Sequence, residues 1–180
     1  MPVGNVVRLK WTNKKSICWV TALTVLGIVC FPANPLVFAG LIKTDFYPPL
    51  FIVGWIVWSI GMVLVMAPIT LFPRRGGVSK GKSFVHTTRL VDTGVYAVVR
   101  HPQYLGGILS IFVTTMLWYP HWLFTVLGLI GTAIFYLSTG EEEERLIQQF
   151  GHDYIRYMQR VPRMNLVLGI IRLWSRRRHE

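Results

Sequence analysis

A short basic and aromatic segment interrupts an otherwise apolar chain, and its residue types could bind an anion. It reads Arg100-His101-Pro102, with Gln103 and Tyr104 directly after it. A proline suits the first turn of a helix and disfavours helical geometry in the residue before it, so Arg100 and His101 should lie at a helix N-terminus. Free backbone N–H groups and the helix dipole favour an anion there. The alternative is an ordinary proline-started helix with a snorkelling arginine and an interfacial tyrosine.

The acidic run Glu141–Glu144 could bind a cation. It holds half of the chain's eight acidic residues. Four adjacent carboxylates repel one another, and a cationic ligand would relieve that repulsion. A structural interpretation is also available, because Thr139 and Glu142 have the spacing of a capping box and Glu141 can pair with Arg145.

A phosphate-binding pattern occurs in residues 76–83, which match G-x-x-x-x-G-K-[ST]. A P-loop needs a buried strand before it and a helix after it, whereas an apolar stretch suited to a membrane precedes this one. We therefore interpret the segment as a basic loop near lipid headgroups, without nucleotide hydrolysis.

Residues 150–163 predict an amphipathic helix at the membrane surface. Gly151 suits a helix C-terminus and Asp153 a new N-cap. Tyr154 and Tyr157 then share one face of the helix, opposite Arg156. The following apolar run 164–174 is too short to span a bilayer and is also expected at the interface.

The elements that must position these segments are membrane helices. Hydrophobic residues make up 52% of the chain, charged residues only 15%, and mean hydropathy is +0.45; soluble domains carry about 25% charged residues. The formal charge of +11 would suit nucleic acid, but long uncharged runs exclude such a domain, so we expect no nucleic-acid partner. The basic residues are better explained as topology signals and contacts with membrane lipids. Cys18 and Cys30 have no histidine or second cysteine at ligand spacing, and no metal site is expected.

Four apolar stretches predict an all-α, polytopic integral membrane protein with four to five transmembrane helices. The first contains Pro32 and Pro35, and is either one kinked helix or a helix with a second short crossing from Pro35. The last two are joined only by Pro120 and His121, which predicts a short helical hairpin; each arm has about 16 residues, short for the ~20 that cross the hydrocarbon. The stretches are Ile17–Ile42, Pro49–Phe72, Leu105–Tyr119 and Trp122–Leu137.

Charge placement predicts the topology. All but one of the 19 Lys and Arg residues lie in residues 1–15, 73–104 and 139–180, which the positive-inside rule places in the cytoplasm. A fifth helix would move the N-terminus outside. We expect one structural domain overall, and the oligomeric state stays open. N-terminal transmembrane helices would occupy residues 1–72, and a cofactor-binding catalytic part would occupy 73–180, with the hairpin at 105–137.

Taken together, the motifs resemble the isoprenylcysteine carboxyl methyltransferase family. The resemblance covers roughly residues 87–163, and the shorter N-terminal part suggests a prokaryotic form in the cell membrane. Membrane phospholipid methyltransferases share much of the pattern, so it specifies the cofactor better than the substrate. The motifs are Arg100-His101-Pro102-x-Tyr104-x-Gly106, Glu142-Glu143-x-x-Leu146, Phe150-Gly151-x-x-Tyr154-x-x-Tyr157 and Val161-Pro162.

The resemblance implies a C-terminal catalytic part that encloses S-adenosylmethionine, with S-adenosylhomocysteine as product. In the implied site Glu142 faces the amino group of the cofactor. The implied cofactor-binding residues are Arg89, Leu90, Val91, Tyr96, His101, Pro102, Gln103, Tyr104 and Glu142, and the implied catalytic residues are Arg100, His101, Tyr104 and Glu142. Eukaryotic members carry an arginine where Ser138 stands, so a substrate carboxylate would need another arginine here. The candidates are Arg100, Arg156 and Arg163.

The expected activity is methyl transfer to the carboxylate of a lipophilic, prenylcysteine-type substrate that enters from the bilayer, with the catalytic face cytoplasmic. N-methylation of a phospholipid or other lipophilic amine is the alternative; it would need a base, such as Glu143, Glu144 or His152. A non-catalytic membrane protein, such as a transporter subunit, is the alternative from another class. That alternative predicts ionisable residues within the spans, and the apolar stretches have none before their ends.

Overall fold

The computed structural model describes residues 35–75 and 89–178 of the 180-residue chain, and within these ranges every regular element is helical. The expectation of an all-α fold is confirmed for this part of the chain. The α-helices are α2 (Pro35–Phe38), α3 (Pro48–Arg75), α4 (Pro102–Gly107), α5 (Thr114–Trp118), α6 (Trp122–Phe150), α7 (His152–Arg160) and α8 (Leu166–Arg177). The other two elements are a 3₁₀ turn, η1 (Gly94–Ala97), and a π-helical segment, η2 (Ile108–Val113).

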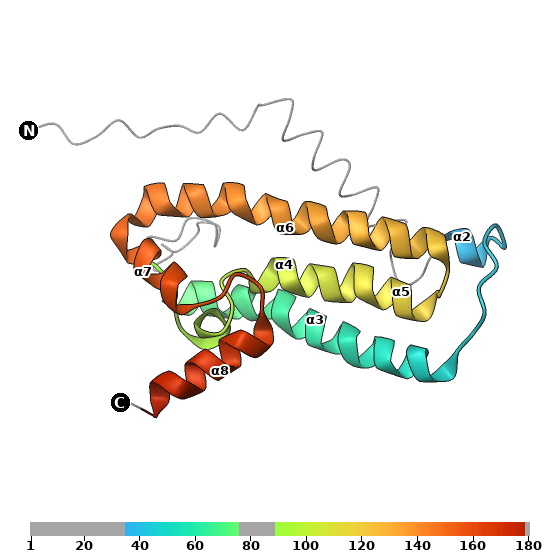
Figure 1. Ribbon diagram of the computed structural model, residues 1–180, viewed down its shortest axis with the longest axis horizontal. Coiled ribbons are helices and arrows are strands. Elements are labelled where there is room, and N and C mark those ends of the chain that lie inside the picture. The colour runs from blue at the N-terminus through green and yellow to red at the C-terminus, as the bar shows by residue number, and fades with distance from the viewer. Residues whose placement is uncertain (1–34, 76–88, 179–180) are drawn as a thin grey trace, which may run out of the picture.

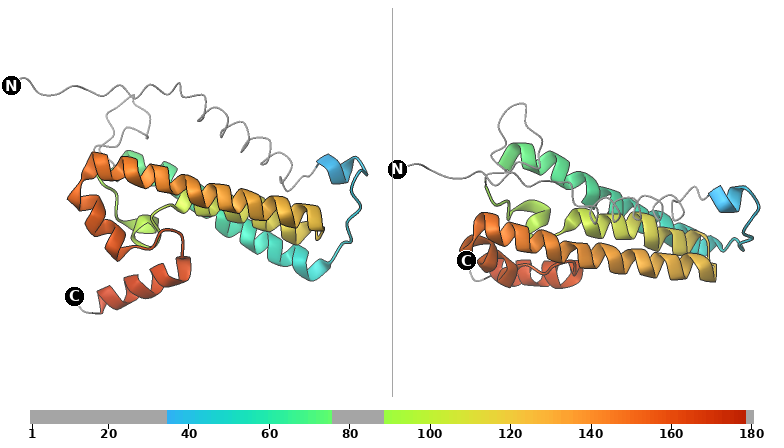
Figure 2. Two further views of the ribbon diagram at one scale, coloured as in Figure 1. Left: turned by 45° about the horizontal axis from the view of Figure 1, so that its top comes forward. Right: turned by 90° about the horizontal axis from the view of Figure 1, so that it is seen from above.

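Three long helical rods lie side by side (Figures 1 and 2). The first is α3, the second is the unbroken run of α4, η2 and α5, and the third is α6. The chain reverses at residues 119–121, where the Nδ1 atom of His121 accepts a hydrogen bond from the Leu123 N–H at 3.2 Å and so caps α6. The short α7 and α8 gather at the end of the bundle that holds the polar segments (Figure 1).

The returning helix is longer than the expected arm. α6 continues from Trp122 to Phe150, through the whole acidic run. The predicted capping box at Thr139 is therefore wrong: Thr139 lies in the helix interior, fully buried, and its hydroxyl donates to the Tyr136 carbonyl at 2.7 Å. A helix that is already hydrogen-bonded through this point has no free N–H groups for a cap to satisfy.

Paired glycines hold α3 and α4 in close contact. A Cβ atom added to Gly106 would lie 2.6 Å from the Gly61 carbonyl oxygen, and one added to Gly61 would lie 2.8 Å from the Gly106 carbonyl oxygen. Gly107 is similarly close to the ring of Phe135, which belongs to α6. The small residues after Pro102 thus permit helix–helix packing, and they fix where α4 begins relative to its neighbours.

Two of the described helices are long and apolar enough to cross a membrane: Pro48–Ala67 within α3, and α6. Only 17% and 22% of their most apolar windows are buried. The core helix of a soluble protein would be mostly buried, so this exposure favours contact with lipid. The exposed side chains of α3 include Ile52, Trp55, Ile56, Ile60 and Val63.

The expected apolar spans lie only partly within the described residues. The stretch Pro49–Phe72 forms α3, which continues through Pro73 and ends two residues later. The stretch Ile17–Ile42 lies mostly outside the described residues, as does the P-loop-like segment 76–83. α2 has only four residues. Within the described residues no membrane-length helix starts at Pro35, and the choice between four and five membrane helices stays a prediction.

The end of the chain packs back on the polar segment. Gly151, with φ of 57°, breaks the helix and is itself the N-cap of α7, two residues before the expected cap Asp153, because α7 begins at His152. The amphipathic prediction is confirmed, since Tyr154 and Tyr157 are buried and Arg156 is exposed. α8 is amphipathic as well, with Val167, Ile170, Ile171 and Trp174 exposed.

Candidate active site

The backbone joins the first and last motifs of the sequence. The Arg100 N–H donates to the Pro162 carbonyl at 3.1 Å, and the His101 N–H donates to the Arg163 carbonyl at 3.2 Å. Pro102 begins α4 directly afterwards and leaves His101 in a non-helical conformation, with φ of −122° and ψ of 65°. Residues 100–101 and 162–163, about sixty positions apart in the sequence, thus lie side by side and form one wall of the site. No local pattern predicts this pairing.

Glu143 is the centre of this wall. Its side chain is 4% exposed and projects from α6. Its Oε1 atom lies 3.2 Å from His101 Nε2 and 3.2 Å from Arg100 Nη1, while Oε2 accepts a hydrogen bond from Arg163 Nη2. A buried carboxylate is tolerated only with such partners. Its role is therefore different from that of Glu142, which is 30% exposed on the adjacent position.

The surroundings of His101 determine its protonation. Burial lowers the pKa of the His101 imidazole, although Glu142 and Glu143 oppose that shift. The ring is therefore neutral at pH 7. Because Glu143 can only accept a hydrogen bond while it is held by two guanidinium groups, Nε2 carries the proton and Nδ1 is an acceptor. Nδ1 lies 4.0 Å from Glu142 Oε2. Two acceptors thus face each other with no proton between them, an arrangement that suits a ligand ammonium group.

Four tyrosines stand around these groups as neutral phenols. Burial is the main cause that raises the pKa of Tyr96, Tyr104, Tyr154 and Tyr157 above its ordinary value. The Tyr157 hydroxyl donates to the Tyr96 carbonyl at 2.7 Å, which ties α7 to η1. The Tyr104 ring meets His101 edge-on, with ring centroids 5.8 Å apart.

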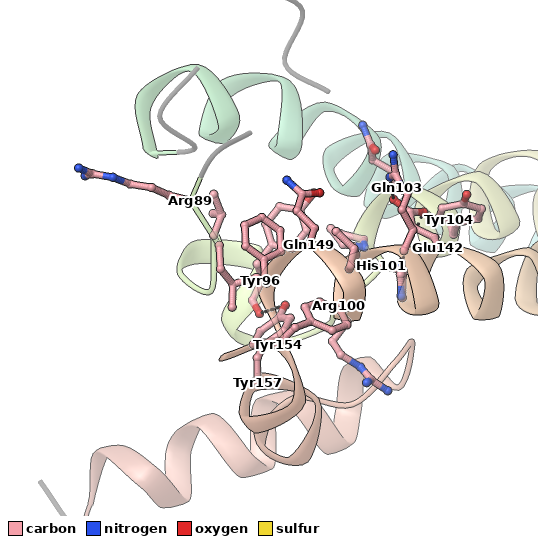
Figure 3. A pocket seen from close by; sticks show the side chains of 16 residues that line it. Arg89, Tyr96, Arg100, His101, Gln103, Tyr104, Glu142, Gln149, Tyr154 and Tyr157 are labelled. Carbon is pink, nitrogen blue, oxygen red and sulfur yellow. Dashed lines mark hydrogen bonds and ion pairs between the residues drawn. The ribbon is translucent and has the colours of Figure 1, made fainter. Parts of the chain in front are cut away.

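A cavity of about 820 Å³, counting its open mouth, lies between the segment 89–104 and the helices α6 and α7. Figure 3 shows its side chains, with Arg89 extending away from the rest. Every residue that the resemblance implied lines this cavity: Arg89, Leu90, Val91, Tyr96, Arg100, His101, Pro102, Gln103, Tyr104 and Glu142. The structure therefore brings together residues from two distant parts of the sequence.

Six further residues line the cavity and were not assigned to the site from the sequence, although Leu146, Phe150, Tyr154 and Tyr157 belong to its motifs. The six are Arg145, Leu146, Gln149, Phe150, Tyr154 and Tyr157. A signal for four of them was present. Positions 145, 146, 149 and 150 follow Glu142 by three, four, seven and eight residues, the spacing of one helix face.

Other candidates lie elsewhere. Arg156 is exposed and pairs with Asp153 at 2.5 Å, along an open groove outside the cavity. Arg145 pairs with Glu142 at 3.4 Å, although the sequence suggested Glu141. Glu144 and His152 are exposed and are not among the cavity's side chains. In the part of the chain that the structure describes, His, Cys, Asp and Glu do not gather in threes at metal-binding distance.

The sequence is similar to those of known methyltransferases. A sequence model described as phospholipid methyltransferase matches residues 50–153, from α3 to the start of α7. Methanethiol S-methyltransferase 2 of Bradyrhizobium diazoefficiens is 36% identical over 106 residues, which cover 59% of this chain and 36% of that protein. The mouse protein-S-isoprenylcysteine O-methyltransferase is 43% identical over 86 residues, which cover 47% of this chain and 29% of that protein.

The Xenopus laevis protein-S-isoprenylcysteine O-methyltransferase is 32% identical over 135 residues, covering 67% of this chain and 44% of that protein. The chain thus spans less than half the length of each of these three relatives. No solved structure matches it. The family match covers more than half of the chain and includes both the segment around His101 and the acidic run. The chain therefore belongs to the phospholipid methyltransferase family.

Proposed function

We propose that this chain is a membrane-embedded methyltransferase that uses S-adenosylmethionine. The observation that carries the proposal is the pair formed by Glu142 Oε2 and His101 Nδ1, two acceptors 4.0 Å apart in the wall of the cavity. When bound, S-adenosylmethionine supplies an activated methyl group on a sulfonium. The family match and the names of the relatives support the same activity.

The residues of the cavity fit this cofactor. Glu142 and the unprotonated Nδ1 of His101 can accept hydrogen bonds from its ammonium group, and the negative charge of Glu142 complements the added sulfonium charge. Apolar and aromatic side chains offer surfaces for an adenine ring; they are Leu90, Val91, Tyr96 and Phe150. Glu143 holds His101 in the tautomer that this role needs.

The proposed acceptor is the carboxylate of a lipophilic substrate of the prenylcysteine type, the class named for the mouse relative. Methyl transfer is an in-line displacement, so the residues contribute mainly by positioning the two reactants. A carboxylate is already a nucleophile and needs no base. Its negative charge and the sulfonium charge are both neutralised as the bond forms, which a dry pocket favours.

An amine or a thiol acceptor, such as methanethiol for the bacterial relative, would first have to lose a proton. The bases suggested by the sequence are poorly placed for this. Glu143 is buried and shared by Arg100 and Arg163, and Glu144 and His152 do not line the cavity. These acceptors are therefore the second choice.

In the proposed arrangement α3 and α6 cross the bilayer and the cavity opens at its cytoplasmic boundary. The lipophilic substrate then enters from the bilayer, and the cofactor enters from the cytoplasm. The positions of the basic residues support this orientation.

The test uses the full chain in detergent with radiolabelled S-adenosylmethionine. We expect labelled product from a farnesylcysteine analogue, and a base-labile label, because a methyl ester hydrolyses where a methylamine does not. Label transfer to phosphatidylethanolamine instead would select the amine alternative. If the wild-type protein neither bound the cofactor nor transferred label, a non-catalytic role would replace this proposal.

A pair of variants tests the site. Glu142→Gln should abolish most cofactor affinity, while Glu141→Gln on the exposed neighbouring position should preserve it, because Glu141 does not line the cavity. Equal cofactor affinities in the two variants would contradict the assignment of Glu142 to the cofactor site.

A further inference from the structure

The cavity contains buried donors that no protein group satisfies. Within the described residues, the Tyr154 hydroxyl and the Nε and Nη1 atoms of Arg100 are buried without a hydrogen-bond partner. Tyr154 is 2% exposed, and the Arg100 side chain is 10% exposed. Arg100 Nη1 does form an ion pair with Glu143 at 3.2 Å, but not in a hydrogen-bonding orientation. Native proteins satisfy nearly all such groups, so these exceptions need a reason.

Tyr157, one turn further along α7, has a hydroxyl with a structural role. Tyr157 lies on the same face of α7, and its hydroxyl donates to the Tyr96 carbonyl at 2.7 Å. Tyr154 has the same burial and no such acceptor. A phenylalanine would fill the same apolar space without leaving a buried hydroxyl unpaired. The hydroxyl of Tyr154 is therefore better explained by a ligand than by the fold.

Charge at this end of the cavity favours an anion. Arg100 and Arg163 both pair with Glu143, so two guanidinium groups share one carboxylate. His101 adds no charge because burial keeps it neutral. Glu143 therefore balances only one of the two positive charges, and of the two arginines Arg100 is the one that lines the cavity. An anionic group in the cavity would be attracted to this surplus positive charge.

The hydrogen-bond donors that the sequence suggested for an anion already donate to other protein groups. The backbone N–H groups of Arg100 and His101 donate to Pro162 and Arg163. The one N–H of the neutral His101 ring faces Glu143, and Pro102 has no N–H. These groups cannot bind a second acceptor at full strength.

We infer that Arg100 and Tyr154 form an anion subsite that takes a carboxylate. The inference rests on the proposed function and deepens it. Glu142 marks the opposite, acceptor side of His101, so the cavity is polarised from donors to acceptors across one imidazole ring. A single α-amino acid group, with its ammonium beside Glu142 and its carboxylate beside Arg100, matches this polarity.

Two ligands could supply the carboxylate: the methionine part of the cofactor, or the methyl acceptor. The experiment separates them with the variant Tyr154→Phe in the full chain. Binding is measured for S-adenosylhomocysteine, and for 5′-methylthioadenosine, which lacks the amino acid group. Steady-state kinetics with a farnesylcysteine analogue give the KM of the acceptor.

If the cofactor supplies the carboxylate, Tyr154→Phe should weaken S-adenosylhomocysteine binding by on the order of 10-fold, the usual effect of a lost hydrogen bond to a charged group. Affinity for 5′-methylthioadenosine should stay unchanged. If the acceptor supplies it, S-adenosylhomocysteine affinity should stay constant and the KM of the acceptor should rise by a similar factor. Either pattern supports the subsite.

Unchanged affinity and unchanged KM in Tyr154→Phe would overturn the subsite and leave the proposed function intact. Wild-type protein that bound neither ligand would overturn both. Tyr47→Phe is the matched control, because Tyr47 is 57% exposed before α3 and its hydroxyl lies outside the cavity. A Tyr154→Phe melting temperature at or above that of wild type excludes misfolding as the cause of weaker binding.

Discussion

Glu143 Oε1 lies 3.2 Å from His101 Nε2, a buried contact between residues 42 positions apart in the sequence. The same oxygen pairs with Arg100, and the other oxygen pairs with Arg163. One carboxylate therefore joins the segment before α4, the helix α6 and the segment after α7. This places Glu143 in a positioning role and leaves Glu142 to face the cavity.

Replacing Glu143 should cost more stability than replacing any other carboxylate in the acidic run. Glu143→Gln removes the charge that compensates two guanidinium groups, and breaking a buried ion pair costs about 3–5 kcal/mol. We expect a clear fall in the melting temperature of the detergent-solubilised protein. Glu144→Gln, on the exposed adjacent position, should leave it almost unchanged. Equal melting temperatures for both variants would show that Glu143 does not hold the wall together.

Stability should fall as the pH is lowered below neutrality. Burial lowers the pKa of His101 in the fold, whereas an unfolded histidine titrates near pH ~6.5. Below that pH the unfolded state binds more protons than the folded state, so the stability present above it is lost progressively as the pH falls towards the lowered pKa. Thermal unfolding between pH 8 and 5 measures this loss.

His101→Asn should flatten that pH dependence, and His152→Asn, at an exposed position, should not. Cofactor affinity should follow the same pH range, because protonation of Nδ1 removes an acceptor from the ammonium. A profile that His101→Asn does not change would contradict the assigned protonation.

Loss of the hydroxyl should lower the stability of the protein at Tyr157 but not at Tyr154. Tyr157→Phe breaks the hydrogen bond to the Tyr96 carbonyl and should destabilise the protein by about 1 kcal/mol. Tyr154→Phe removes a buried hydroxyl without a partner, so the free energy of unfolding without ligand should stay constant or rise. Chemical or thermal unfolding of the two variants provides the comparison. A larger loss of stability in Tyr154→Phe would mean that its hydroxyl has a structural partner.

Replacing glycine with alanine should change stability in opposite directions at two helical positions. Gly106→Ala places a methyl group 2.6 Å from the Gly61 carbonyl oxygen, so α3 and α4 must separate and the protein should lose stability. Gly140→Ala adds a methyl group to the interior of α6 with nothing within 4 Å. It should stabilise the helix by up to about 1 kcal/mol, since alanine has the better helix propensity. Melting temperatures of both variants check the contrast.

The sequence by itself determined the helical class and the residues that would gather. Uncharged apolar runs can satisfy their backbone in lipid only as helices or closed barrels. α3 follows its run closely, while α6 begins with its run and continues beyond it to Phe150. The residues that resemblance implied, from Arg89 to Tyr104 with Glu142, line one cavity. Local chemistry was sufficient for the helical class, because apolar periodicity depends on near neighbours, whereas the set of cavity residues was implied only by the resemblance to a family.

The tertiary structure alone decided which member of each similar pair has which role. Glu142 and Glu143 are adjacent, and Tyr154 and Tyr157 share one helix face, so no local pattern distinguishes them. The partners that distinguish them, His101, Arg163 and the Tyr96 carbonyl, come from other elements. Thr139 failed as a cap for the same reason, because α6 continues through it on the strength of its own hydrogen bonds and its packing against α4 and η2.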